Sequence, residues 1–195
     1  MIHYSKYKLA ESKDTLVFSF GRMNPPTLGH GKLLDKMNKI SKDFRMYISK
    51  SQDKKKNPLD YKTKMDYVKK MFPQYSSNIV DDGNIRMVFD ILVKAHDEGF
   101  KNITMVVGSD RVKEFELLIK KYNGEQARHG FYDFANIMVV SAGERDPDAD
   151  DVSGMSASKM RQAVQDNDLE SFQQGVPRNW KHTLDLFKAV EDGMK

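Results

Sequence analysis

Short apolar runs alternate with helical patterns along this chain of 195 residues, and that alternation constrains the fold more than any other feature. A short apolar run is typical of a buried strand, whereas apolar residues three and four positions apart mark one face of a helix. The runs expected to form strands are residues 15–20, 44–49, 78–80, 102–107 and 136–141. Strands that alternate with helices predict an α/β fold with a doubly wound, parallel five-stranded sheet, whose ligands bind beyond the carboxyl ends of the strands.

Amphipathic patterns fill the gaps between these runs. They predict helices with the apolar faces Leu33, Met37 and Ile40; Tyr61, Met65, Val68 and Phe72; and Val88, Ile91, Leu92 and Ala95, followed by a helix over residues 110–122. Residues 144–151 are acidic and contain a proline, so we expect a mobile loop there. We expect a single domain over residues 1–195, with a helical C-terminal region at about 156–195 that is interrupted at residues 175–177 and ends on Leu184, Phe187 and Val190.

Composition narrows the class of protein. Hydrophobic residues make up 39% of the chain and charged residues 31%, as in ordinary globular proteins. No apolar stretch approaches the roughly 20 residues of a membrane span, and the polar N-terminus is unlike a secretory signal, so we expect a cytoplasmic location. The absence of cysteine excludes disulfides, thiolate metal sites and a cysteine nucleophile.

Charge favours small anionic ligands. The net charge of +4 comes from lysines and arginines spread among nearly as many carboxylates, a distribution that argues against nucleic-acid binding. Three consecutive lysines at residues 54–56 are compatible with a solvated loop or with a loop that faces phosphate. His96 and His129 lack the spacing of a metal site, and we expect both to be structural, as we expect Trp180 to be a packing residue.

The segment after the first predicted strand has the features of an anion-binding turn. It reads Gly-Arg-Met-Asn-Pro-Pro-Thr-Leu-Gly-His from residue 21 to residue 30. Glycines let main-chain N–H groups approach an anion closely, and the positive end of the following helix dipole favours negative charge. His30 delivers an imidazole to the same point. The alternative is a helix-start histidine that bonds its own backbone.

A second polar constellation lies near the C-terminus, where residues 154–161 read Gly-Met-Ser-Ala-Ser-Lys-Met-Arg. Ser156 or Ser158 can cap a helix whose N–H groups point outward, and Arg161 supplies a forked donor that matches phosphate oxygens. Such a set can hold a polyphosphate. Taken alone, an ordinary helix cap with a surface arginine is the simpler interpretation, but the first motif favours the phosphate site.

The two motifs, Thr27-x-Gly29-His30 and Ser156-x-Ser158-x-x-Arg161, resemble the (H/T)xGH and ISxTxxR signatures of the nucleotidyltransferases. The resemblance spans most of the chain. It is closest to the archaeal-type nicotinamide mononucleotide (NMN) adenylyltransferases, whose small phage-encoded members also look similar and would act in the host cytoplasm. Further matches to that family are Gly21-Arg22, Pro25, Phe172 and Val176-Pro177. The resemblance implies a Rossmann-like fold.

The resemblance also implies roles for single residues. The implied ATP-binding set is Gly21, Arg22, Met23, Thr27, Gly29, His30, Gly108, Asp110, Ser156, Ser158 and Arg161. Within it, the implied catalytic residues are His30 as a hydrogen-bond donor, Thr27 as a neutral donor near the α-phosphate, and Arg161 on the β and γ phosphates. The acceptor would meet Ser51, Gln52, Asn57 and Lys64, which are similar to the family's Ser-x-Gln and Asn-Pro-Phe segment and the arginine after it. Asp110 as a helix cap and Lys64 on a solvated helix face are the alternatives.

The implied reaction transfers AMP from Mg-ATP to a phosphate monoester and releases pyrophosphate. NMN is the leading acceptor and would give NAD. Thr27 stands where that family has histidine, as in the pantetheine-phosphate branch, so pantetheine-phosphate adenylyl transfer or cytidylyl transfer is the alternative. No tryptophan lies in the central region, where a nicotinamide ring could stack.

Other expectations concern partners and cofactors. A second alternative is a non-catalytic nucleotide-binding or virion-associated protein, against which the intact His30 and Arg161 argue. A tRNA synthetase fits poorly, because 195 residues leave little room for tRNA recognition. We expect Mg²⁺ to be held mainly through ATP phosphates, since no carboxylate cluster has convincing ligand spacing. Relatives of this fold often assemble, so a homo-oligomer is compatible with the resemblance.

Overall fold

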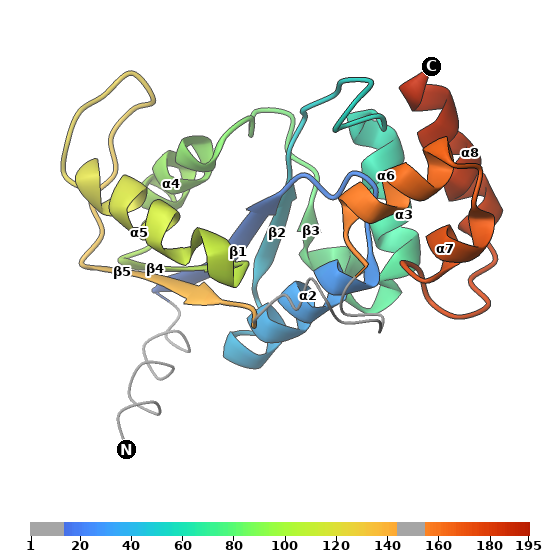
Figure 1. Ribbon diagram of the computed structural model, residues 1–195. Helices are drawn as coiled ribbons and strands as arrows, with labels where there is room; N and C mark the ends of the chain where they lie inside the picture. The colour runs from blue at the N-terminus through green and yellow to red at the C-terminus, as the bar shows by residue number, and fades with distance from the viewer. Residues whose placement is uncertain (1–13, 144–154) are drawn as a thin grey trace. The chain divides into compact units, whose positions relative to one another are not determined.

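Five parallel strands form the sheet of this protein, of which a computed structural model describes residues 14–143 and 155–195. The strands are β1 (Thr15–Gly21), β2 (Arg45–Ile48), β3 (Ile79–Val80), β4 (Asn102–Val107) and β5 (Asn136–Ser141), and their order is β3-β2-β1-β4-β5 (Figure 1). In the register of β1 with β4, Thr15 lies opposite Asn102 and Phe18 opposite Met105. The predicted doubly wound α/β fold is confirmed, whereas the expected loop at 144–151 lies outside the described residues.

The helices follow the strands in the expected alternation. They are α2 (Leu28–Ile40), α3 (Tyr61–Met71), η1 (Pro73–Asn78), α4 (Val88–Asp97), η2 (Ser109–Arg111), α5 (Val112–Lys121), α6 (Ala157–Gln165), α7 (Leu169–Gln173) and α8 (Thr183–Met194). The helix predicted over residues 110–122 therefore begins as a 3₁₀ turn, η2, before α5. In the described part of the chain, no helix combines the length and the apolar character that crossing a membrane requires.

The described chain groups into two compact units, and each unit is built from three separate stretches of sequence. The first unit contains residues 14–20, 33–47 and 82–143, which include most of the sheet with α4 and α5. The second unit contains residues 21–32, 48–81 and 155–195, which include the turn before α2, helix α3 and helices α6 to α8. A single domain over residues 1–195 stays a prediction.

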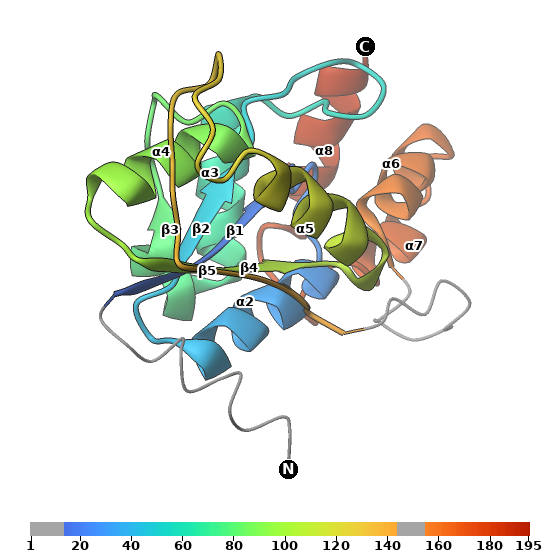
Figure 2. The same cartoon turned by 90° about the vertical axis from the view of Figure 1, so that its left-hand side faces the viewer.

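The core of the first unit is the centre of the sheet. Side chains of β1 and β4 are at most 1% exposed at Leu16, Val17, Phe18, Ile103, Met105 and Val106, because helices cover both faces. In Figure 2, residues 33–40 of α2 and helix α4 lie on opposite sides of the sheet, and α5 packs against β5. The predicted apolar face of α4 is confirmed. On α2, however, Leu34 is buried with Met37 and Ile40, and Leu33 is not, because Leu34 lies three residues before Met37 on the same helical face.

Both histidines of the first unit that we singled out pack among aromatic rings. The His129 ring stacks on Phe89 with centroids 4.0 Å apart, and the His96 ring meets Phe131 edge-on at 5.3 Å. Tyr132, which is fully buried in the same cluster, donates its hydroxyl to the carbonyl of Ile119. These contacts are typical of structural histidines.

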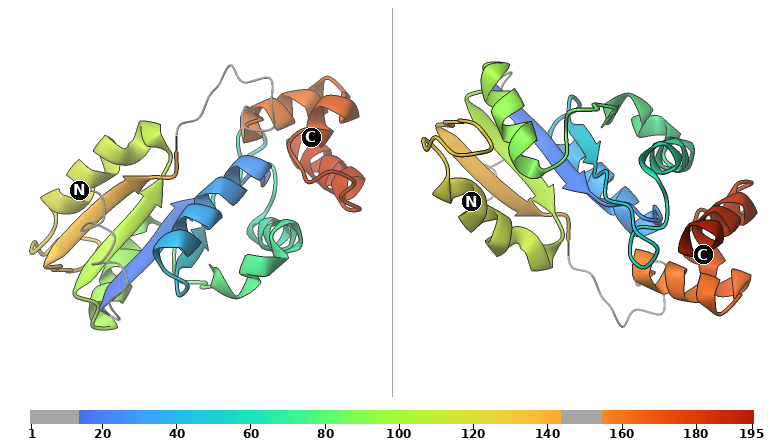
Figure 3. Two further views of the ribbon diagram at one scale, coloured as in Figure 1. Left: turned by 90° about the horizontal axis from the view of Figure 1, so that it is seen from below. Right: turned by 90° about the horizontal axis from the view of Figure 1, so that it is seen from above.

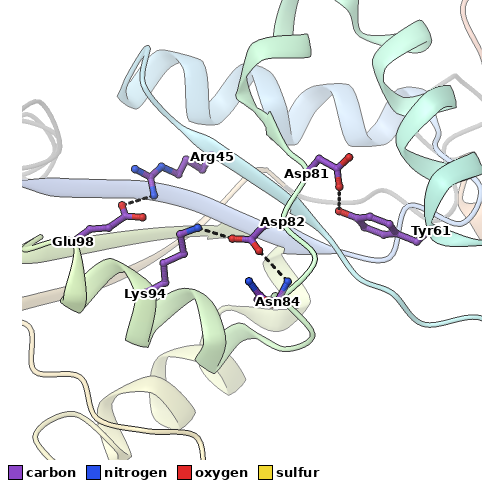
Figure 4. A network of polar contacts seen from close by, with 7 residues as sticks. All are labelled: Arg45, Tyr61, Asp81, Asp82, Asn84, Lys94 and Glu98. Carbon is purple, nitrogen blue, oxygen red and sulfur yellow. Dashed lines mark hydrogen bonds and ion pairs between the residues drawn. The ribbon is translucent and has the colours of Figure 1, made fainter.

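Polar contacts fix the segment after β3 and the end of α4 (Figure 4). In the first unit, Lys94 pairs with Asp82, Asp82 also accepts the N–H of Asn84, and Arg45 pairs with Glu98 at 2.6 Å. Partly exposed ion pairs of this kind contribute about 0–1 kcal/mol each, so they orient the loop more than they stabilise the fold.

The second unit has its own small helical core. Helices α6, α7 and α8, drawn in orange to red, pack together (Figure 3), and the rings of Phe172 and Phe187 meet at 5.1 Å. The predicted face of α8 is wrong at Leu184, which is 48% exposed, because Leu186 is the fully buried residue of the first turn. Trp180 is a packing residue as expected, since its ring meets Tyr67 edge-on.

Candidate functional site

The turn between β1 and α2 is held by a buried asparagine. Asn24 is 1% exposed, and its amide donates to the carbonyl of Leu59 and accepts the N–H of Leu59, both at 3.0 Å. The turn also contains a cis bond between Asn24 and Pro25, and Met23 has a positive φ of 44°. Asn24 is a site residue that sequence analysis missed. Its only sequence signal was an asparagine before two prolines, which indicates a turn but not a partner.

Thr27 and His30 are joined at the start of α2. The main-chain N–H of Thr27 donates to Nδ1 of His30 at 2.9 Å, and the Thr27 hydroxyl lies 3.1 Å from the same nitrogen. A residue in the first helical turn that accepts the N–H three positions earlier reproduces half of a capping box. The expected alternative for His30 was a histidine at the start of a helix that bonds the local backbone. The Nδ1 atom confirms this alternative, because it accepts the N–H of Thr27. Since Nδ1 accepts, the proton of the neutral ring resides on Nε2, which makes Nε2 a donor.

The second motif reaches the same turn through Arg161 on α6. Its Nη1 donates to the main-chain oxygen of Asn24 at 2.7 Å across 137 residues of sequence, and its Nη2 donates to the hydroxyl of Ser158 at 3.0 Å. Ser156 caps α6 by accepting the N–H of Lys159 at 3.1 Å. The structure thus brings the two sequence motifs together within one unit.

Positive charge gathers at this junction. Burial lowers the pKa of Arg161, the nearby Arg22 guanidinium lowers it further, and the Asp53 carboxylate opposes both effects. Two guanidinium groups that repel one another favour the binding of a polyanion between or beside them. Gly29 lies beside the Thr27 hydroxyl, and a Cβ atom at this position would make an ordinary van der Waals contact with it at 3.4 Å.

The loop after β2 turns back on itself at residues 53–57. The Asp53 carboxylate accepts the N–H groups of Lys55 and Lys56 and the side-chain amide of Asn57. These donors, with Lys56 first, lower the pKa of Asp53 to about 2. Asn57 is 6% exposed, so its side chain shapes this turn, and its predicted contact with an acceptor stays a prediction. The three lysines of the turn are exposed, and Lys54 donates to the main-chain oxygen of Lys195 at 2.6 Å.

Lys64 supports the same loop from inside. Its side chain is fully buried, and its ammonium donates to the carbonyls of Ser49 at 2.5 Å and Ser51 at 3.0 Å. Burial lowers the pKa of Lys64 to about 8, although Asp60 acts in the opposite direction. The alternative of a solvated helix face is therefore wrong for this residue. Ser51 and Gln52 are exposed on the loop that Lys64 holds, and direct contact of all three with an acceptor stays a prediction.

Replacement of the buried lysine is expected to change how stability depends on pH. The pKa of Lys64 falls from 10.5 to about 8 on folding, so between these values the unfolded chain binds more protons than the folded chain. The free energy of unfolding of the wild type should therefore rise with pH in this range, relative to Lys64→Met, by up to about 3 kcal/mol. Urea unfolding from about pH 7 to about pH 10.5 measures the difference.

Lys62→Met is the matched control, because Lys62 is exposed on the same helix. Its unfolding free energy should run parallel to that of the wild type over the whole pH range. Parallel curves for Lys64→Met as well would contradict the effect of burial on Lys64.

Gly108 and Asp110 lie in the first unit, directly after β4. A Cβ atom at Gly108 would come within 2.7 Å of the Asp110 carboxylate, so a larger residue there would require the exposed Asp110 side chain to turn away. Gly108 occupies the N-cap position of η2, and Asp110, which is exposed, lies inside that turn. The expected alternative of Asp110 as the cap is not what the structure shows. A role of either residue toward ATP stays a prediction.

Metal-binding residues do not gather in the described part of the chain, where no three His, Cys, Asp or Glu side chains could hold a metal ion together. The donors that the site offers are instead N–H, guanidinium and hydroxyl groups, which suit phosphate oxygens.

This combination defines a class of protein. In doubly wound α/β proteins, the turn between a strand and the following helix is a common place for phosphate to bind. In this protein an arginine from a distant helix bonds that turn. The family model described as cytidylyltransferase-like matches residues 18–163, which is most of the chain. The protein belongs to this family of the nucleotidyltransferase superfamily.

Solved structures show the same fold. A protein described as a nicotinate-nucleotide adenylyltransferase from Vibrio parahaemolyticus is 16% identical, with a TM-score of 0.52 over 90% of this chain and 98% of that one. The Plasmodium falciparum nicotinic acid mononucleotide adenylyltransferase complexed with NaAD is 13% identical, with a TM-score of 0.63 over 93% of this chain and 99% of that one. A search of curated protein sequences finds no relative.

Proposed function

We propose that this protein transfers AMP from Mg-ATP to a small phosphate monoester and releases pyrophosphate. The observation that supports the proposal most directly is the hydrogen bond from Arg161 to the main-chain oxygen of Asn24, because it joins the two distant sequence motifs that we expect to bind phosphate. Membership in the cytidylyltransferase-like family agrees with this reaction. The presence of both His30 and Arg161 argues against a protein that binds nucleotide without turnover.

The reaction needs alignment and charge stabilisation more than it needs a protein nucleophile. An oxygen of the acceptor phosphate attacks the α-phosphorus of ATP, and the bond to the bridging oxygen breaks, with its electron pair leaving on pyrophosphate. The acceptor is already anionic at neutral pH, so no base has to remove a proton. In this proposal His30 donates from Nε2 to the α-phosphate, where negative charge develops.

The remaining groups hold the leaving pyrophosphate. Arg161 and Ser158, which already bond one another, would bind the β and γ phosphates together with the N-terminus of α6 capped by Ser156. The turn at Gly21 and Arg22 would approach the triphosphate. Mg²⁺ enters with ATP as part of the substrate and screens its charge, mainly through phosphate oxygens and water.

A pyridine mononucleotide is the acceptor that we favour. The sequence resemblance favours NMN, and the names of the two similar structures favour nicotinate mononucleotide as a close second. Both compounds are phosphate monoesters with a positively charged or zwitterionic ring system. Thr27 alone favours phosphopantetheine, and the family description alone favours CTP as the donor.

A panel of donors and acceptors tests the proposal. We expect purified protein with Mg-ATP to release pyrophosphate with NMN or nicotinate mononucleotide, and to release little with phosphopantetheine or when CTP replaces ATP. Product mass identifies the acceptor, and His30→Ala shows whether the release depends on this site. ATP binding without release for every acceptor would contradict the proposed reaction and would support a non-catalytic nucleotide-binding protein.

A further inference from the structure

The side chain of Thr27 is turned away from solvent and toward His30. Thr27 is 2% exposed, and its hydroxyl lies 3.1 Å from Nδ1 of the imidazole. In this arrangement the hydroxyl contacts the histidine, whereas the family resemblance implied a neutral donor near the α-phosphate.

The direction of the hydrogen bonds follows from the groups involved. A main-chain N–H can only donate, so the 2.9 Å contact from Thr27 N makes Nδ1 an acceptor. A ring nitrogen that accepts carries no proton, and the neutral imidazole must then carry its proton on Nε2. The Thr27 hydroxyl can therefore only donate to Nδ1, and the two donors of Thr27 share one acceptor.

We propose that Thr27 is a positioning residue that acts through His30. Its main-chain N–H and its hydroxyl together keep the ring proton on Nε2 and the ring in one orientation. The effect on turnover rests on the proposed function, whereas the state of the ring does not. Thr27 stands where the motif of the family has its first histidine. In this proposal it does not contact phosphate and instead fixes the proton position and the orientation of the motif's second histidine, His30.

Nitrogen NMR of protein labelled with ¹⁵N-histidine tests the state of the ring without substrate. The chain has five histidines, and His30→Ala identifies which signals belong to His30. We expect an unprotonated Nδ1 and a protonated Nε2 at neutral pH in the wild type. A protonated Nδ1 would overturn the proposal, and this measurement needs neither turnover nor any variant of Thr27 to fold.

Substitutions of Thr27 test the hydroxyl. Thr27→Val keeps the shape and the main-chain donor, so we expect the Nδ1 signal of His30 to move, kcat to fall about three- to tenfold, and the Kd for ATP to change less than about twofold. Thr27→Ser keeps the hydroxyl and should retain the wild-type signals. Thr63→Val, which removes a hydroxyl that bonds Asp60 at the start of α3, should leave the His30 signals unchanged.

Two outcomes would overturn the positioning role. Unchanged His30 signals in Thr27→Val together with a weaker affinity for ATP would show that the hydroxyl binds phosphate directly. A moved signal with unchanged kcat would show that the contact has no part in the reaction. Failure of every acceptor to react would count against the proposed function alone, because the nitrogen spectra would still decide the contact.

Discussion

His30→Ala is expected to lower kcat about 10²- to 10³-fold, while the Kd for Mg-ATP stays within about threefold of the wild type. The reason is that Nε2 should bond an oxygen whose negative charge grows as the α-phosphorus is attacked, and such a bond is stronger in the transition state than in the ground state. Loss of the ring removes this gain but removes little of the binding of the nucleotide.

The measurement pairs pyrophosphate release with isothermal titration of Mg-ATP on the same preparation. His182→Ala is a suitable control, because His182 lies just before α8 in the same unit and contacts the Trp180 ring. Its kcat should match that of the wild type. Equal losses of rate and ATP affinity in His30→Ala would show that the ring serves binding in general, and the proposed role would be wrong.

Arg161→Ala is expected to raise the Kd for ATP about 10- to 100-fold, because it removes charge-assisted hydrogen bonds to phosphate that are worth about 1.5–3 kcal/mol. Arg161→Lys should recover only part of the affinity, since a lysine cannot bond Asn24 and a phosphate oxygen with one planar fork. Titration of Arg161→Ala with ATP and with AMP distinguishes contacts with the β and γ phosphates from contacts with the rest of the nucleotide. AMP lacks the β and γ phosphates, so the affinity of this variant for AMP should change little.

Arg178→Ala provides the control for charge alone, because Arg178 is exposed in the same unit and follows α7. Circular dichroism and thermal unfolding must accompany the Arg161 variants, since Arg161 also anchors the turn through Asn24. A folded Arg161→Ala protein with unchanged ATP affinity would exclude contact with the β and γ phosphates.

The strands could be predicted from the sequence because each is a continuous apolar run with breakers at its ends. The fourth and fifth predicted strands have the bounds of β4 and β5, the first and third differ by one residue at one end, and the second is longer than β2 by one residue at each end. The buried faces of the helices were harder to predict than the strands. On α2, for example, the adjacent residues Leu33 and Leu34 both fit a helical period with Met37, and only Leu34 is buried. The break between α6 and α7 was missed, although Asp166-Asn167-Asp168 is rich in turn formers, Asn167 has a φ of 53°, and Asp168 caps α7.

Within the site, sequence motifs identified the chemical groups but not their partners. The pairing of Arg161 with Asn24 joins residues far apart in sequence, and a single sequence carries no record of such a contact. Lys64 stands among other lysines of a helix, so its complete burial could not be distinguished from the exposure of its neighbours. The direction of the Thr27 hydroxyl depends on a side-chain rotamer, which only a structure provides.

The alternation of the two units along the chain has a consequence for how this protein can be divided or recombined. The polypeptide chain alternates between the two units, and each unit contains three separate stretches of sequence. Cleavage of one peptide bond therefore cannot separate the two units. A gene fragment ending at residue 143 would encode every described residue of the first unit and only part of the second. Exchange of substrate-binding parts between relatives by a single crossover would break the second unit, whereas replacement of individual loops would leave both units whole.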